Sequence, residues 1–494
     1  MENTDSNNEH TPMIPFTDKK NGGEVIASGG FGCVFKPALK CKGQARVKNM
    51  VSKLMEKRFV NDEYKDIQRF KPKLQNVPNY KDYYLIDNIT KCVPDTISKK
   101  DLESYNAKCR FLQKKNATLT TTTVKKNLML LNMPDGGVEL YTFIDNSKYD
   151  VLPKINNLMI DLLKNGILPM NKLGIYHSDI KDSNLLVKDK IRLIDWGLSV
   201  EYTKKIPELW SERTLQYNVP FSSILFNPMF EEMYSQFLKQ TKEITMETLR
   251  PFVIHYMFRW FKYRGEGHYK AINRIFKNLF VDDFYNSQPE GNTQPKDNAQ
   301  PKDNSQPEDK NIESHFTNYY VINYLCEILI AFTKSKKFHY DEYINKVFSK
   351  IIDIWGFIMS YNPIVEKLSY HYNVLNKVEK LLFSKLKQIF LHYLFLPRVE
   401  PIVIDKLVHD LKELNPLFEK CSVHEGIHSF NGTSSQINTS VYSENNFVPS
   451  KYSKSKSYKN SRMKTTKQKK INNETTRRKT PRRKTTRRKT KESQ

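Results

Sequence analysis

The residues best suited to chemistry lie in two short segments that are close together in the sequence. Residues 175–187 read Ile-Tyr-His-Ser-Asp-Ile-Lys-Asp-Ser-Asn-Leu-Leu-Val and contain His177, Asp179, Lys181 and Asn184. Eleven residues after Asn184, a strand-like Arg-Leu-Ile leads into Asp195, Trp196 and Gly197. One carboxylate that can take a proton from a hydroxyl is therefore near an amide and a second carboxylate that can hold Mg²⁺. Transfer of a phosphoryl group from ATP requires this set of groups.

A glycine-rich turn further upstream would let backbone N–H groups approach phosphates, because side chains are missing there. It lies between two expected strands and consists of Ile26, Ala27, Ser28, Gly29, Gly30, Phe31, Gly32, Cys33 and Val34. Lys53 follows Val51 in a later apolar strand pattern, which suits an ammonium that reaches the α- and β-phosphates. Glu63, on a helix expected over residues 59–70, would hold Lys53 as an ion pair. Taken singly, these features also fit an ordinary turn, an exposed lysine and a solvated carboxylate.

In this order, the glycine-rich loop, the strand lysine, H-x-D-x-K-x-x-N and D-x-G resemble the eukaryotic protein kinases. The resemblance covers roughly residues 24–425. It implies an α+β, bilobal fold with a small β-rich lobe over about 24–131 and a large helical lobe over about 135–425. ATP would lie between the lobes, and Asn132 and Met133 would form the hinge.

The resemblance also implies a role for each site residue. Asp179 would orient and deprotonate the substrate hydroxyl, and Lys181 would steady the γ-phosphate. Asn184 and Asp195 would hold Mg²⁺, and Leu131 would line the back of the adenine pocket. The cofactors implied are ATP and Mg²⁺.

A segment much later in the chain, Ile351-Ile-Asp-Ile-Trp-Gly356, looks like the large-lobe helix whose buried aspartate supports the catalytic loop in kinases. Asp353 would be that residue. The alternative is an ordinary aspartate at the N-terminus of a helix. In the kinase reading, about 130 residues separate this segment from Val219-Pro220-Phe221, so residues 222–350 would be a mostly helical insertion.

Several positions depart from the kinase pattern. Ala27 replaces the first loop glycine, and Trp196 replaces the usual phenylalanine of D-F-G. Ser178 replaces the arginine that binds a phosphate on the activation segment, so we predict activity without phosphorylation of that segment. Val219-Pro220-Phe221 replaces Ala-Pro-Glu, which leaves the anchoring of the substrate-binding segment open.

Two other readings compete with a Ser/Thr protein kinase. Small-molecule kinases related to aminoglycoside and choline kinases also use H-x-D-x-x-x-x-N and often carry Ile-Asp-Trp, as at residues 194–196. Lys181 favours a protein kinase, because the small-molecule enzymes typically lack it. The second alternative is a pseudokinase scaffold with a nucleic-acid-binding tail, but the lysine and both aspartates that pseudokinases usually lose are present.

The whole pattern, with its insertions and Asn/Lys-rich composition, is similar to Ser/Thr protein kinases encoded by giant DNA viruses of the mimivirus type. This resemblance implies a viral protein in the host cytoplasm, with the virion or the nucleus as alternatives. The substrate would be a protein.

The ends of the chain and one internal stretch lack apolar periodicity and are predicted to be disordered. They are residues 1–23, a four-fold hexapeptide repeat at 286–309, and a tail over 426–494. Of the net charge of +26, the last 44 residues carry nineteen Lys and Arg against two Glu, which leaves about +9 for the rest. The tail therefore suits sequence-independent contact with nucleic acid or an acidic membrane surface, or merely a solvated extension.

The remaining composition narrows the setting. The six cysteines show no C-x-x-C pair, so neither a zinc site nor a disulfide framework is predicted, and a reducing compartment fits best. The polar start is unlike a secretory signal. The longest apolar stretch, residues 320–332, is too short to span a membrane and predicts a buried helix.

Overall fold

The computed structural model describes residues 23–28, 32–102, 105–109, 127–203, 205–286, 307–396 and 399–428. Most of the predicted disordered segments lie outside these residues, including the whole basic tail beyond residue 428. Their predicted borders were slightly too wide. Gly23 donates its backbone N–H to Asp101, Asn286 ends helix α11, residues 307–309 begin α12, and residues 426–428 end α18.

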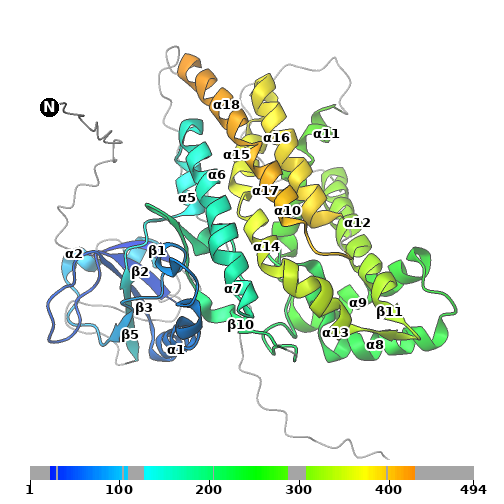
Figure 1. Cartoon of the computed structure of the whole chain (residues 1–494), viewed down its shortest axis with the longest axis horizontal. Helices are drawn as coiled ribbons and strands as arrows, with labels where there is room; N and C mark the ends of the chain where they lie inside the picture. Colours follow the sequence, from blue (N-terminus) through cyan, green and yellow to red (C-terminus); the bar gives the residue numbers. More distant parts are fainter. Residues whose placement is uncertain are drawn as a thin grey trace, which may run out of the picture. The chain divides into compact units, whose positions relative to one another are not determined.

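The N-terminal part is an antiparallel five-stranded sheet in the order β1-β2-β3-β5-β4 (Figure 1). The strands are β1 (Glu24–Ser28), β2 (Gly32–Lys36), β3 (Met50–Glu56), β4 (Thr90–Cys92) and β5 (Leu128–Pro134). Strand β5 continues three residues beyond Leu131, so Asn132 and Met133, the predicted hinge, lie within the strand. The mixture of this sheet with the largely helical remainder confirms the α+β class.

One long helix, α1 (Lys57–Leu74), follows β3 directly and is longer than the predicted 59–70. Its buried residues, Val60, Ile67, Phe70 and Leu74, repeat at the spacing of one helix face. This face packs on the core, which fixes the direction of the polar residues between them. Glu63 is therefore placed by the burial of its apolar neighbours.

Residues 88–123 are polar and rich in Lys and Thr, a composition that predicts an irregular insertion. Their described part contains β4, α2 (Lys99–Leu102) and α3 (Tyr105–Lys108), and η1 (Tyr80–Asp82) precedes them. The prediction that the cysteines form no disulfides was wrong. The structure pairs Cys33 with Cys109 and Cys41 with Cys92, with Cα–Cα distances of 5.7 and 5.8 Å. The partners are 76 and 51 residues apart in sequence, and only the folding of the sheet brings them together.

Between residues 138 and 201, helices alternate with short strands. The elements are β6 (Val138–Glu139), α5 (Leu140–Asp145), η2 (Tyr149–Val151), α6 (Leu152–Asp161), the π-helical η3 (Leu162–Ile167), α7 (Leu168–Lys172), β7 (Ile175–Tyr176), η4 (Asp182–Asn184), β8 (Leu185–Val187), β9 (Ile191–Leu193), η5 (Trp196–Leu198) and β10 (Val200–Glu201). Strands β6, β8 and β9 form one small sheet, and β7 pairs with β10. Apolar residues at 155, 158, 162, 163 and 167 repeat with the period of a helix and predict one over 154–173. The run from α6 to α7 confirms it.

Beyond residue 220 the described chain is almost entirely helical, as predicted. The elements are η6 (Phe221–Leu225), α8 (Pro228–Gln240), α9 (Met246–Arg264), α10 (Tyr269–Leu279), α11 (Val281–Asn286), α12 (Pro307–Phe332), β11 (Thr333–Lys334), β12 (Lys337–Phe338), α13 (Tyr340–Tyr343), the π-helical η7 (Ile344–Phe348), α14 (Ser349–Met359), α15 (Asn362–Tyr370), η8 (Tyr372–Val374), α16 (Lys377–Phe390), the π-helical η9 (Leu391–Phe395), α17 (Ile404–Lys412) and α18 (Asn415–His428).

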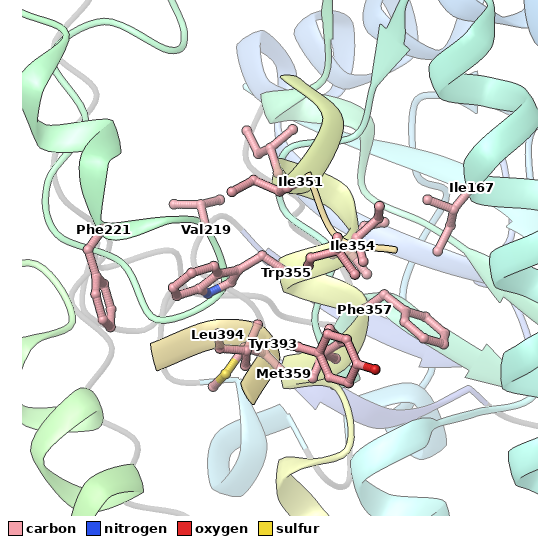
Figure 2. Close-up of a cluster of buried hydrophobic side chains, with 14 of the residues drawn as sticks. Ile167, Val219, Phe221, Ile351, Ile354, Trp355, Phe357, Met359, Tyr393 and Leu394 are labelled. Carbon is pink, nitrogen blue, oxygen red and sulfur yellow. The ribbon is translucent and has the colours of Figure 1, made fainter. Parts of the chain in front are cut away.

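Helix α14 lies in the middle of the helical core, and all eleven of its residues except Lys350 are buried. Figure 2 shows Trp355 of this helix among side chains from several other elements, including Phe221 and Leu394. The ring centroids of Trp355 and Phe221 are 5.2 Å apart. Because α14 is buried on every side, a polar residue within it must find partners inside the protein.

The predicted buried helix at 320–332 is confirmed as the C-terminal half of α12, where Val321, Leu325 and Leu329 are fully buried. Among the described residues, no helix is both long and apolar enough to cross a membrane.

Candidate active site

Asp353 of α14 organises the loop that contains Asp179. One of its carboxylate oxygens accepts the backbone N–H of His177 at 2.9 Å and the side-chain amide of Asn171 at 2.7 Å. The other accepts the backbone N–H of Ser178 at 2.7 Å. Asp353 lies in the middle of α14, so the alternative of an aspartate at the start of a helix is wrong. Its burial raises the pKa of its carboxyl group, and the three donors offset part of that cost.

The carboxylate of Asp179 is held on both of its oxygens. Oδ1 accepts from the side-chain amide of Asn218 at 2.8 Å. Oδ2 accepts from Lys181 Nζ and Asn184 Nδ2, each at 3.0 Å. Burial would raise the pKa of Asp179, but the charge of Lys181 and these hydrogen bonds lower it below its usual range. The group is therefore a fixed carboxylate at neutral pH.

Asn184 and Asp195 lie next to each other through a backbone contact. The N–H of Ile194, the residue before Asp195, donates to the carbonyl of Asn184 at 3.1 Å. The backbone of Asp195 is left-handed, with φ of 67°, which is uncommon for a residue with a side chain. One carboxylate and one amide oxygen are hard ligands, and Mg²⁺ in ATP sites is typically held by few protein groups together with phosphates. The donor chemistry of the pair thus fits Mg²⁺.

Lys53 of β3 and Glu63 of α1 form an ion pair. Lys53 Nζ lies 2.8 and 3.0 Å from the two carboxylate oxygens, and both side chains are largely buried. Burial alone would lower the pKa of Lys53, but the charges of Glu63 and Asp195 raise it well above its usual value. Asp195 is thus close enough to act on the ammonium, which connects the sheet with the loop after β9.

Strand pairing places several of the predicted nucleotide-binding residues on one face of the sheet. Ala27 pairs with Val34, Val34 with Lys53, and Lys53 with Leu131. Directly paired residues project from the same face of a sheet, and so do residues two apart in one strand. Val51 and its partner Met133 therefore share the face of Lys53. This face carries the six residues Ala27, Val34, Val51, Lys53, Leu131 and Met133.

Other predicted nucleotide-binding residues do not belong to this group of six. The side chain of Cys33 is buried and bonded to Cys109, and that of Asn132 is buried with its oxygen accepting from Ser52 at 2.5 Å. Ser28 pairs with Cys33, and Ile26 lies at the irregularity of β1, about half exposed.

At the turn of the glycine-rich hairpin, Gly29, Gly30 and Phe31 lie outside the described residues. Gly32 cannot carry a side chain, because a Cβ there would meet the carbonyl oxygen of Leu54 at 2.1 Å. The close packing of β2 against β3 thus accounts for this glycine.

Trp196, which follows Asp195, is a packing residue. It is fully buried, and its ring centroid is 5.0 Å from His177, 5.7 Å from Tyr84 and 6.2 Å from Phe70 of α1. The indole thus connects α1 with the loop that contains His177 and Asp179, next to the Asp195 backbone.

Three residues that contact the Asp179 loop were missed in the sequence. Trp210 Nε1 donates to Ser178 Oγ at 2.9 Å, and Arg213 Nη1 donates to the Ser178 carbonyl at 2.8 Å. Asn218 is the third, through its bond to Asp179. The one available signal was that Asn218 directly precedes Val219-Pro220-Phe221. Ser178 stands where the kinase pattern has an arginine. The indole of Trp210 and the guanidinium of Arg213 contact Ser178, so the smaller side chain leaves no gap there.

Comparison with known proteins gives no family, because no family model and no curated sequence matches this chain. The function is therefore inferred from the arrangement of the described residues.

Proposed function

We propose that this protein is an ATP-dependent protein kinase that transfers the γ-phosphate of ATP to serine and threonine hydroxyls of protein substrates. The observation that carries the proposal is the convergence of four groups from distant parts of the chain. Lys53 lies within electrostatic reach of Asp195, the backbone next to Asp195 is bonded to Asn184, and the amide of Asn184 is bonded to Asp179. One electrostatic interaction and two hydrogen bonds therefore connect the predicted phosphate-binding lysine with the predicted catalytic carboxylate.

Each group has a role that its surroundings support. Asp179 is ionised and fixed on both oxygens, so it can orient a hydroxyl and accept its proton. Lys181, bonded to the same carboxylate, adds a positive charge where the transferred phosphoryl group would gain negative charge. Lys53, held by Glu63, would contact the α- and β-phosphates. Mg²⁺, held by Asn184 and Asp195, would neutralise phosphate charge.

The architecture supports the same proposal. A small antiparallel sheet with one helix carries the lysine, and the helical part carries the carboxylates. This agrees with the bilobal arrangement that the kinase resemblance implies. The apolar residues on the same face of the sheet as Lys53, among them Val34, Val51 and Leu131, would contact the adenine base.

Replacing Asp179 with Asn tests the enzymatic reading. The amide keeps the size of the carboxylate but cannot accept a proton, so phosphate transfer to protein should fall by about 10² to 10⁴-fold. Binding of ATP should remain, since Lys53 and Asp195 are unchanged. The matched control is Asp189→Asn, at a 68% exposed side chain between β8 and β9, which should keep full activity. Equal labelling by wild type and Asp179→Asn would refute the proposal.

The acceptor class needs a separate measurement. Labelled ATP and Mg²⁺ would be incubated with the protein and either generic protein substrates or small alcohols and aminoglycosides. We expect label on serine and threonine of the proteins. Label on the small molecules alone would establish the small-molecule kinase alternative, and nucleotide binding without any transfer would establish the pseudokinase alternative.

A further inference from the structure

The end of α9 and the turn after it contact the backbone of residues 212–215. Trp260 Nε1 donates to the carbonyl of Arg213 at 3.1 Å, and Arg264 Nε donates to the carbonyl of Glu212 at 2.9 Å. The backbone N–H of His268 donates to the carbonyl of Leu215 at 2.7 Å. We call Trp260, Arg264, Gly267 and His268 the clamp. All four belong to residues 222–350, the stretch predicted as an insertion without an assigned role.

The clamp and residues 212–215 are in close backbone contact. At Gly267, whose φ is 61°, an added Cβ would lie 2.2 Å from the carbonyl oxygen of Leu215. Glu212 has a left-handed backbone with φ of 58°, and its carbonyl is the one that Arg264 binds. A strained residue persists only where its surroundings determine its conformation. Trp260 is also fully buried, so its hydrogen bond is shielded from water.

Residues 212–218 transmit this contact to the catalytic loop. The guanidinium of Arg213, whose carbonyl is held by Trp260, donates to the Ser178 carbonyl. Five residues later, Asn218 donates to Asp179. Two hydrogen bonds therefore connect the clamp to Ser178, the residue before Asp179, through residues that are themselves buried.

The clamp also packs against Tyr217, the residue before Asn218. The ring of His268 lies 5.2 Å from the ring of Tyr217 at an interplanar angle of 33°. Burial, followed by the charge of Lys181, lowers the pKa of His268 to about 4. The imidazole is therefore neutral at physiological pH and adds no charge to compete with Lys181.

We infer that the clamp is an intramolecular support that holds residues 210–218 in the conformation that positions Asp179 for its substrate. Trp260 and Arg264 are then positioning residues, and the segment takes its shape from within the chain without a covalent modification. The catalytic consequence rests on the proposed kinase function. The structural consequence, a segment fixed by the clamp, does not.

The test uses the full chain with Trp260→Phe and Arg264→Met combined. Phe keeps an aromatic ring but removes the N–H donor, and Met keeps much of the arginine stem. Trypsin cleavage after Arg213 reports on the segment directly, because the carbonyl of the bond that is cut is the one bound by Trp260. We expect this cleavage to become at least about tenfold faster, since the segment loses two hydrogen bonds. KM for a protein substrate should rise about tenfold, while KM for ATP stays the same.

Two controls come from the same part of the chain. Arg259→Met removes an exposed cation from α9, and Tyr234→Phe removes a partly buried hydrogen bond between α8 and Thr333. Neither should change the cleavage rate. The single variant Trp260→Phe, with a smaller expected effect in the same direction, serves if the double variant does not fold.

The outcomes separate the two proposals. Unchanged cleavage after Arg213 in both clamp variants overturns the inference. Faster cleavage with an unchanged KM for protein overturns the positioning role. Faster cleavage in a protein whose wild type transfers no phosphate supports the structural part of the inference and refutes the proposed kinase function instead.

Discussion

The carboxyl groups around the Asp179 loop experience opposite electrostatic effects over short distances. Lys181 bonds directly to Asp179 and, with Asn218, lowers the pKa of that carboxyl group despite its burial. Among the described residues, no cation bonds directly to the carboxylate of Asp182 or Glu139, although Asp182 accepts the backbone N–H of Ser183 at 2.9 Å. Burial raises their pKa to about 6 and about 7, and the charge of Asp182 adds to the shift of Glu139. The bond to Lys181 thus favours the ionised form of Asp179, whereas burial favours the protonated forms of Asp182 and Glu139.

Glu139 gives a prediction about stability and pH. Its pKa is about 7 in the folded protein, against about 4.3 in an unfolded chain. The folded state therefore favours the protonated acid, and the stability contributed by Glu139 is present below about pH 4 and lost as the pH rises through 7. Glu139→Gln cannot ionise and should raise the free energy of unfolding at pH 8 by about 2 kcal/mol.

Denaturant unfolding at a series of pH values would measure this effect. The advantage of Glu139→Gln should shrink as the pH falls from 8 to 5. Glu419→Gln, at an exposed position of α18, is the matched control and should change little at either pH. An advantage that is constant with pH would show that ionisation of Glu139 is not its cause.

At the scale of single elements, α14 shows how a buried helix can support a loop. Its Asp353 accepts from two backbone N–H groups and from Asn171, so each oxygen has a donor. In Asp353→Asn, an NH₂ group would have to face one of these donors. We expect the free energy of unfolding to fall by about 2–3 kcal/mol, because a buried donor loses its acceptor.

Urea titration followed by tryptophan fluorescence would test this, since the ring of Trp355 lies in the same helix. Asp405→Asn, at an exposed position of α17, makes the same chemical change and should cost less than about 0.5 kcal/mol. If both variants unfold at the same urea concentration, Asp353 does not support the loop as argued.

The sequence predicted the elements that show a local pattern. The helical period gave α1 and the run from α6 to α7, and the apolar stretch at 320–332 gave half of α12. It could not predict contacts between residues far apart. Asn218 reaches Asp179 across 39 positions, and the pairing of Cys41 with Cys92 depends on how β4 joins the sheet. Trp260 lies within α9 and His268 directly precedes α10, and neither position shows a sequence pattern that predicts contact with residues 212–215.

At the scale of the whole molecule, the positive charge is divided unevenly. The last 44 residues carry +17 of the net +26, and they include three copies of Arg-Arg-Lys-Thr. These residues lie outside the described part of the chain, so the following prediction about DNA binding rests on their composition alone. A chain segment with many cations and few aromatics binds phosphates without reading bases, and it releases counterions when it does so.

We therefore predict that the full chain binds duplex DNA of any sequence with an affinity that falls steeply with salt. If six to ten phosphates are contacted, the affinity should fall by about 10³ to 10⁵-fold between 50 and 200 mM salt. Replacing the six arginines of the repeats with glutamine, at Arg477, Arg478, Arg482, Arg483, Arg487 and Arg488, keeps the length of the tail and should flatten the salt dependence by several phosphate equivalents. Phosphate transfer to a neutral protein substrate should stay the same, because none of these residues belongs to the candidate active site. An affinity insensitive to salt, or equal for both proteins, would mean that the tail does not bind phosphates.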